Sequence, residues 1–357
     1  MSTTTTQQPP EPATRAELSR GSLPLYFSPV LLTASAAVVA GVLLAFSSFG
    51  VMLWALLTAV AYLVISVTAS VRVEGARKAK DRFVTAIVYG CFLLAMAPLV
   101  SVLWTVAQNG MARFDIYFLS VSMNGVLPSM DAGGVYHAIV GTLAITGMAT
   151  VISVPVGVLT AVFLVEYAQG RLKKAITFFV DVMTGIPSIV AGLFVVALWM
   201  MLLGPGHLNG ASGALALAVL MIPVVVRSSE EMLRLVPMEL REASYALGVP
   251  KWRTITKVVL PTSASGLTTG IVLAIARVIG ETAPLVLTAG SSAVSINWNL
   301  FEGQMMNLPV FIYSQVRMGG AVNYERAWAA ALTLILVVML LFFLARMIGR
   351  LFAPKTR

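Results

Sequence analysis

The sequence predicts an all-α, polytopic transmembrane helical bundle, on the basis of its composition, its long apolar runs and the distribution of its charges. Of the 357 residues, 58% are hydrophobic and 11% are charged, and the mean hydropathy is +0.90. These values exceed what a soluble domain with a hydrated surface carries. The net charge of +9 does not indicate nucleic-acid binding, because the basic residues fall between apolar runs rather than on one solvated face.

The individual spans follow from the lengths of the apolar runs. A span needs about 20 mostly apolar residues, which at ~1.5 Å rise per residue cross a hydrocarbon core of ~30 Å. The first apolar stretch is about twice that length, so we expect a tight hairpin turn at Ser47 and Ser48. The segments that qualify, about eight in all, are 29-46, 49-71, 83-107, 135-165, 175-203, 208-226, 264-290 and 327-348.

The positions of Lys and Arg predict the orientation in the membrane. With both termini in the cytoplasm, all but four of the 24 Lys and Arg residues lie on the cytoplasmic side, as the positive-inside rule requires. The exceptions are Arg113, Arg317 and Arg326 in outer segments and Arg277 within a span. Residues 1-28, rich in Thr, Gln and Pro, are predicted to be a disordered cytoplasmic tail.

Residues 228-262 form the longest predicted cytoplasmic segment, which is too polar to span but still periodic. We expect two short helices lying along the membrane surface, with Gly248 as the left-handed residue after the first and Pro250 in the first turn of the second. An ordinary amphipathic connector would have the same features. The apolar face of the first helix would consist of Met238, Leu240, Ala243 and Leu247.

The spacing within this segment is that of a known motif. Glu242-Ala243-Ser244, with Gly248 four residues later and Val258, Leu260 and Pro261 at the end, resembles the EAA loop of ABC importer permeases. Ser244 replaces the second Ala of that pattern, and Val258 replaces its usual Ile. The coupling residues that the resemblance implies are Glu242, Ala243, Ser244, Gly248, Leu260 and Pro261.

The EAA resemblance implies a helix that sits in a groove of a cytoplasmic ATPase, with Glu242 making polar contacts and Gly248 permitting the turn. The chain itself contains no Walker A pattern. We therefore expect ATP and Mg to be used by separate ATPase subunits, and this chain to hold no cofactor.

Four further stretches are similar to PstA-type permeases of phosphate ABC importers, and the similarity runs from about residue 83 to the C-terminus. They are GGVYHAIVGTL at 133-143, VPVGVLTAVFLVEYA at 154-168, TGIPSIVAGLF at 184-194 and RVIGETAPL at 277-285. The resemblance implies a six-span permease core at 83-350 in a bacterial inner (plasma) membrane. Residues 29-71 have no counterpart in that core and are expected to be an accessory transmembrane hairpin.

The resemblance also implies the partners of the chain. These are a second, homologous permease, a dimer of ATPase subunits, an extracytoplasmic phosphate-binding protein and phosphate itself as the cargo. No nucleic-acid partner is expected.

Arg277 and Glu281 are four residues apart in the seventh predicted span, so we expect them to share one helix face and to reach each other. A charge at the bilayer centre costs at least about 2.5 kcal/mol, so it should face the bundle interior or a hydrated path. A structural ion pair would satisfy this requirement. In a transport role, Arg277 would offer an oxyanion a forked donor while Glu281 holds the guanidinium. Arg277, Glu281 and Thr282 are the candidate residues of the translocation path.

Three alternatives to a phosphate permease remain open. The chain could be a permease for another oxyanion such as molybdate or tungstate, an ion-driven secondary transporter, or a membrane scaffold that transports nothing. The EAA-like loop argues against the second. No Ser-His-Asp array, metal cluster or pair of convergent carboxylates occurs in any loop, so we expect no catalytic residues, no metal site and no enzymatic activity.

Overall fold

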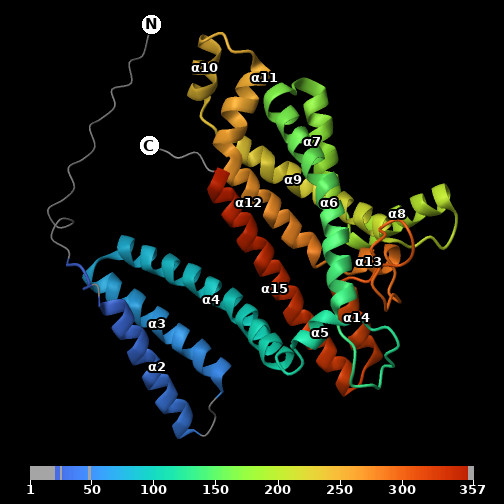
Figure 1. Cartoon of the computed structure of the whole chain (residues 1–357). Helices are drawn as coiled ribbons and strands as arrows, with labels where there is room; N and C mark the ends of the chain where they lie inside the picture. Colours follow the sequence, from blue (N-terminus) through green and yellow to red (C-terminus); the bar gives the residue numbers. More distant parts are fainter. Residues whose placement is uncertain (1–20, 25, 47–49, 353–357) are drawn as a thin grey trace. The chain divides into compact units, whose positions relative to one another are not determined.

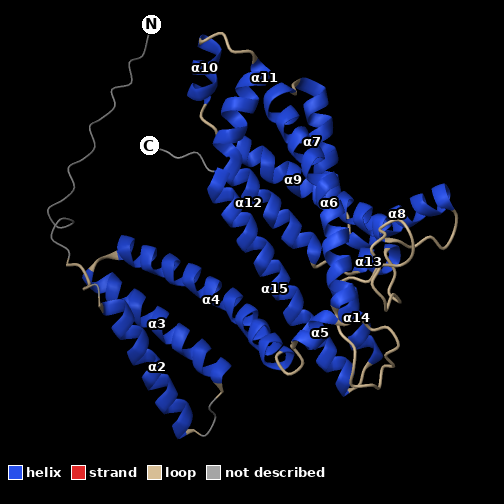
Figure 2. Cartoon of the chain, viewed as in Figure 1, coloured by secondary structure: helices blue, strands red, loops and turns tan. Residues whose placement is uncertain are grey.

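The computed structural model describes residues 21–24, 26–46 and 50–352, and the regular secondary structure of these residues is helical (Figure 2). Most of the predicted tail, and the predicted turn at Ser47 and Ser48, lie outside the described residues. Seven of the described helices are long and apolar enough to cross a membrane, and one bent pair brings the number to eight. This confirms the predicted fold class, in which each helix satisfies its own backbone hydrogen bonds in lipid.

The chain divides into two compact units, residues 1–103 and 104–357. The boundary falls within α4 (Ala76–Gly110), which runs through it without a break. The start of the permease core that the sequence analysis gives, residue 83, lies within the same helix and stays a prediction.

The first unit contains α2 (Phe27–Ala45), α3 (Val51–Val73) and the first part of α4. α2 and α3 pack against each other, and the indole N–H of Trp54 donates a hydrogen bond to the carbonyl oxygen of Ala36 at 2.9 Å. Small residues at such a contact let two helices approach closely in lipid. The buried polar residues of α2 and α3 are all small: Ser35, Thr58, Ser66 and Ser70.

Glu74, between α3 and α4, holds one end of this unit together. Its buried carboxylate accepts hydrogen bonds from Nε of Arg82 at 2.7 Å, from the hydroxyl of Ser70 at 2.8 Å and from the backbone N–H of Leu23 at 2.9 Å. The hydrogen bond from Arg82 outweighs the opposing effect of burial and lowers the pKa of Glu74 to about 2. The carboxylate is therefore ionised throughout the physiological pH range.

The second unit is a bundle built around α9 (Gly210–Arg234), whose residues Ala214, Ala216 and Ala218 are fully buried. At one end of this unit lie α10 (Met238–Ala246) and α11 (Lys251–Thr254), and at the opposite end lie α5 (Ile116–Ser120) and α14 (Leu308–Met318) (Figure 1). α12 (Leu260–Ile279) runs beside α15 (Ala321–Phe352). α6 (Tyr136–Val162) continues into the π-helix η1 (Phe163–Tyr167).

Two glycines of α6 allow direct contact with neighbouring elements. A Cβ added at Gly141 would lie 1.9 Å from the backbone oxygen of Met306, and one added at Gly157 would lie 2.6 Å from Cγ1 of Val225 in α9. Helices that touch in this way pack through backbone atoms, which is common in membrane proteins. α6 is therefore packed tightly against α9 and against the segment that contains Met306.

Arg326, near the start of α15, is fully buried. Its guanidinium donates hydrogen bonds to Oδ1 of Asn323 at 2.8 Å and to the carbonyl oxygens of Pro128, Met130 and Ala132, the last at 2.9 Å. These contacts attach the loop at residues 128–132 to α15. Arg326 is thus a structural residue. The sequence analysis identified it only as an exception to the charge pattern and did not reveal this role.

Arg113 binds the same loop. Its guanidinium donates to the carbonyl oxygen of Ala132 at 3.1 Å and forms an ion pair with Asp131. Two of the three arginines in the predicted outer segments therefore have local structural partners. Their presence does not conflict with the predicted orientation, because the positive-inside rule describes a bias and not each residue.

Candidate functional site

The EAA-like segment folds into α10 (Met238–Ala246), a turn and α11 (Lys251–Thr254). α11 continues through the π-helix η2 (Ile255–Val259) into α12 (Leu260–Ile279) as one helix of 29 residues. The prediction of two short surface helices is therefore wrong for the second helix. Pro261, in the first turn of α12, has no N–H to donate to the preceding turn, and the wider π turn that precedes it accommodates this defect.

Gly248 is in the left-handed conformation that the sequence predicts, with φ of +76°. Its N–H donates to the carbonyl oxygen of Tyr245 at 2.9 Å, and the N–H of Val249 donates to that of Ser244 at 3.2 Å. Glycine adopts this backbone conformation without the steric cost that a Cβ would bring. The turn between α10 and α11 is therefore sharp and fully hydrogen-bonded at its start.

Ser244 has a structural role that explains its departure from the EAA pattern. Its hydroxyl lies 2.8 Å from that of Thr254, and both residues are buried. Alanine at this position could not form the bond. The serine therefore joins α10 to α11 in addition to the turn at Gly248.

α10 presents its apolar side chains outward, a direction that the sequence analysis did not predict. Met238, Leu240 and Leu247 are exposed, Leu247 by 82%, whereas the buried residues of α10 are Arg241 and Ser244. The apolar side chains do lie on the exposed surface of α10, but their periodicity in the sequence cannot show whether the partner of that surface belongs to the same chain. An apolar surface of this kind, left exposed beside polar residues, is typical of a protein interface.

The six predicted coupling residues divide into two groups. Glu242 and Ala243 are exposed on α10 and are available to another molecule. The other four shape the element: Ser244 and Gly248 hold the turn, Leu260 packs against an apolar cluster that includes Leu233 and Val259, and Pro261 follows the π turn.

Arg241, which the sequence analysis did not single out, ties α10 to the rest of the second unit. Its Nη2 and Nε donate to one carboxylate oxygen of Glu166 at 3.0 and 3.1 Å. Further hydrogen bonds from this guanidinium reach the carbonyl oxygens of Leu233, at 2.9 Å, and Val236. The signal that could have found this pair is Glu166 itself, the one acidic residue in the apolar stretch 154–168.

Two predicted spans are broken inside the bundle. α7 (Gly170–Thr184) and α8 (Ser188–Leu203) meet at a bend of 105°, so the predicted span 175-203 is a bent pair of helices and not one straight helix. The predicted span 264-290 is wrong in its bounds, because the candidate span runs from Lys251 to Ile279, where α12 ends, and α13 (Ala283–Thr288) follows after a gap. The two broken helices meet, since a Cβ at Gly192 of α8 would lie 2.8 Å from Cα of Pro284 in α13.

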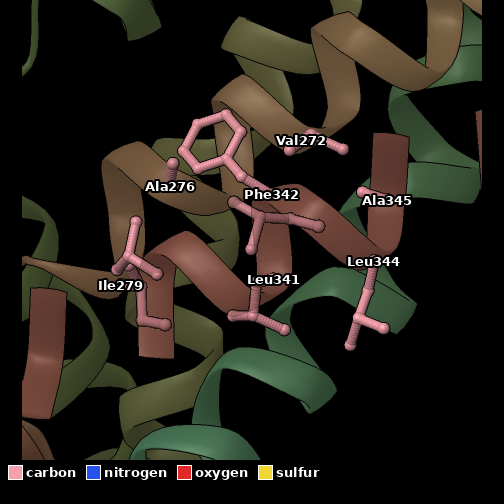
Figure 3. Close-up of a pocket in the computed structure, with 9 residues that line it drawn as sticks. Val272, Ala276, Ile279, Leu341, Phe342, Leu344 and Ala345 are labelled. Atoms are coloured by element: carbon pink, nitrogen blue, oxygen red, sulfur yellow. The ribbon is translucent and has the colours of Figure 1, made fainter. Parts of the chain in front are cut away.

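The end of α12 lies midway along the bundle. An apolar pocket of about 260 Å³ between α12 and α15 is lined by Ala276 and Ile279 from α12 and by residues from Val338 to Ala345 of α15 (Figure 3). α15 has 32 residues, and at ~1.5 Å per residue Val338 lies ~25 Å from its start. Arg277, between Ala276 and Ile279 in sequence, is therefore far from both ends of α15.

Arg277, Glu281 and Thr282 lie on either side of the break between α12 and α13. Arg277 is in the last turn of α12 and its side chain is exposed, whereas Glu281 and Thr282 are half-buried and follow the end of the helix. The predicted shared helix face is wrong, because α12 ends two residues before Glu281. Among the described residues, no ion pair within 4.0 Å joins Arg277 to Glu281.

Known proteins share both the sequence and the fold of this chain. A family model described as "Binding-protein-dependent transport system inner membrane component" matches residues 153–357. The "Phosphate transport system permease protein PstA 1" of Mycobacterium tuberculosis (strain ATCC 25618 / H37Rv) is 49% identical over 282 residues, which cover 79% of this chain and 91% of that protein. The PstA protein of Yersinia pestis is 37% identical over 281 residues, 78% of this chain and 92% of that protein.

A solved structure has the same fold at low sequence identity. It is a bacterial ABC transporter involved in the import of the acidic polysaccharide alginate, with a TM-score of 0.53 and 16% identity over 76% of this chain and 96% of that chain. The family model covers more than half of the chain, and the PstA proteins align over more than three quarters of it. The chain therefore belongs to the binding-protein-dependent transport system inner membrane components, among the PstA-type permeases.

Proposed function

We propose that this chain is the membrane-spanning permease subunit of an ATP-driven phosphate importer. The relatives at 49% and 37% identity are named as permeases of phosphate transport systems. The observation that carries the proposal is the EAA-like element, in which a fixed helix exposes Glu242 and an apolar surface at one end of the bundle. A rigid element of this kind can convert movement of a nucleotide-driven partner into movement of membrane helices.

The partners follow from this role. A dimer of separate ATPase subunits would bind the exposed face of α10 and would use ATP and Mg, so this chain would itself be no enzyme and hold no cofactor. The α10 end of the bundle and both termini would then lie in the cytoplasm, in agreement with the charge pattern. A second, homologous permease would complete the path, and an extracytoplasmic phosphate-binding protein would deliver the cargo.

The phosphate path would pass the break between α12 and α13. Interrupted helices near the middle of a membrane are a common site of substrate binding in transporters, because their backbone and polar side chains are accessible there. Arg277 would offer its forked guanidinium to a passing phosphate, with Glu281 and Thr282 beside it in the break. The absence of a tight ion pair on Arg277 among the described residues would leave its donors available to the anion.

The test is an ATPase assay on the purified complex in proteoliposomes, with its binding protein present. Phosphate is expected to stimulate ATP hydrolysis, and molybdate and sulfate are expected not to. Stimulation by molybdate alone would identify the chain as a permease for another oxyanion. Uptake that persists without ATP but stops with the ion gradient would identify a secondary transporter, and a complex that neither hydrolyses ATP nor takes up solute would support a scaffold.

Replacement of Glu242 by alanine is expected to weaken binding of the ATPase about tenfold, because a hydrogen bond to a charged group contributes about 1.5–3 kcal/mol. The measurement is the amount of ATPase that co-purifies with the permease over a range of salt concentrations. The matched control is Glu239→Ala, which removes an exposed carboxylate one turn earlier in α10. Equal losses for the two variants would show that general charge, and not the position of Glu242, attracts the ATPase.

A further inference from the structure

We infer that the buried ion pair between Glu166 and Arg241 is the link that carries movement of the coupling helix α10 into the membrane-spanning helix α6. This inference rests on the proposed function, because it requires that an ATPase moves α10. It assigns a positioning role to two residues outside the six predicted coupling residues. The link joins a helix that faces the partner to one that faces the centre of the bundle.

Arg241 fixes α10 at three points at once. Its side chain is 7% exposed and that of Glu166 is 6% exposed, so the pair is shielded from water. The guanidinium holds Glu166 of η1 and also the carbonyl oxygens of Leu233 and Val236, at the end of α9. Because the planar fork of arginine fixes the direction of each bond, α10 cannot slide along η1 without breaking several of them.

α11 holds η1 from a second side. The ammonium group of Lys251 donates a hydrogen bond to the backbone oxygen of Glu166 and lies 4.8 Å from the centre of the Tyr167 ring. Glu166 is thus held through its side chain by α10 and through its backbone by α11. Since the hydroxyl pair of Ser244 and Thr254 joins α10 to α11, the two contacts on η1 move together.

η1 transmits this movement because it is a continuation of α6 and is anchored to neighbouring helices by a buried leucine. Leu164 of η1 is fully buried in a cluster with Val180 of α7 and Val226 of α9. Further along α6, Gly157 allows direct contact with Val225 of α9. A displacement of η1 therefore acts on α6, α7 and α9, and α7 leads into the bend with α8.

A charged pair performs this role better than an apolar contact would. An apolar surface can slide and repack at small cost, whereas separation of a buried ion pair leaves two charges without partners. When the partner moves α10, the ion pair would accordingly pull η1 along, and α10 would not slide past η1. Replacement of the carboxylate by an amide keeps the shape but removes the charge, which makes Glu166→Gln the sharpest test.

The test compares Glu166→Gln with Glu74→Gln in the reconstituted complex. Glu74 is a matched control, because it is also a buried carboxylate held by an arginine, but it lies in the first unit. The readouts are the stimulation of ATP hydrolysis by phosphate and the number of phosphate ions taken up per ATP. Glu166→Gln is expected to lower both by about fivefold or more, the scale of an allosteric coupling, while basal hydrolysis persists. Glu74→Gln is expected to change neither ratio.

Further variants separate a link from a merely structural contact. The double variant Glu166→Gln/Arg241→Gln is expected to lose no more coupling than the worse single variant, because both remove the same link. Hydrogen exchange of residues 238–247 in the full complex is expected to accelerate in Glu166→Gln and to stay unchanged in Glu74→Gln. If Glu166→Gln kept the coupling of the wild type, the inferred link would be wrong, but the proposed function would stand. A wild-type complex without phosphate stimulation would overturn the proposed function and the link with it.

Discussion

Replacement of Arg277 by alanine is expected to lower phosphate uptake about 10- to 100-fold, because a charge-assisted, bidentate hydrogen bond to the anion contributes about 1.5–3 kcal/mol. The side chain is exposed at the end of α12, midway along the bundle. A charge at that depth costs at least about 2.5 kcal/mol unless it meets water or an anion. Uptake of labelled phosphate into proteoliposomes, in an assembled complex, measures the effect.

Two variants of α12 control this experiment. Arg277→Lys keeps the charge but loses the planar fork, so it is expected to restore uptake only in part. Leu273→Ala changes another exposed side chain one turn earlier on the same helix and is expected to leave uptake unchanged. An Arg277→Ala complex that assembles and transports like the wild type would remove Arg277 from the path.

Replacement of Gly141 by alanine is expected to prevent stable folding of the second unit. The new methyl group would lie 1.9 Å from the backbone oxygen of Met306, and a backbone atom cannot turn aside as the end of a flexible side chain can. The adjacent N–H of Leu308 is also held by the hydroxyl of Thr142 at 2.8 Å, so separation of the two segments would break a buried hydrogen bond. Overpacking of this kind costs about 3 kcal/mol or more.

The measurement is the yield and the thermal unfolding midpoint of the detergent-solubilised protein. Gly147→Ala is the matched control, since it changes a glycine of the same helix with no atom within 4 Å of the added Cβ. That variant is expected to be neutral, or more stable by about 0.5–1 kcal/mol, because alanine favours the helix. Equal behaviour of the two variants would mean that α6 does not pack on the Met306 segment as described.

The sequence predicted the helical spans and the turn at Gly248, because both depend on local signals. Apolar length specifies a helix in lipid, and a glycine after a helical run specifies a left-handed turn. The breaks at Pro187 and at Glu281 lie in segments that are apolar on both sides. Pro187 and Pro284 mark candidate kinks there, because proline interrupts a helix, but the sharpness of each break depends on tertiary packing such as that of Gly192 on Pro284, far apart in the chain.

The contacts of the coupling loop were predicted less completely than its turn. The motif identified Glu242, but it could not reveal that Arg241 points inward, because its partner Glu166 is 75 residues away. The same limit applies to Ser244, whose hydroxyl has a function only when Thr254 lies opposite. Tertiary partners of this kind leave no periodic pattern in one sequence.

The burial of Arg326 has a consequence for the acid tolerance of the loop it holds. The hydrogen bonds that its guanidinium donates end on three carbonyl oxygens and the amide of Asn323, and none of these acceptors gains a proton in mild acid. Arginine also keeps its charge at every physiological pH. Residues 128–132 therefore stay fastened to α15 when the surrounding medium is acidified.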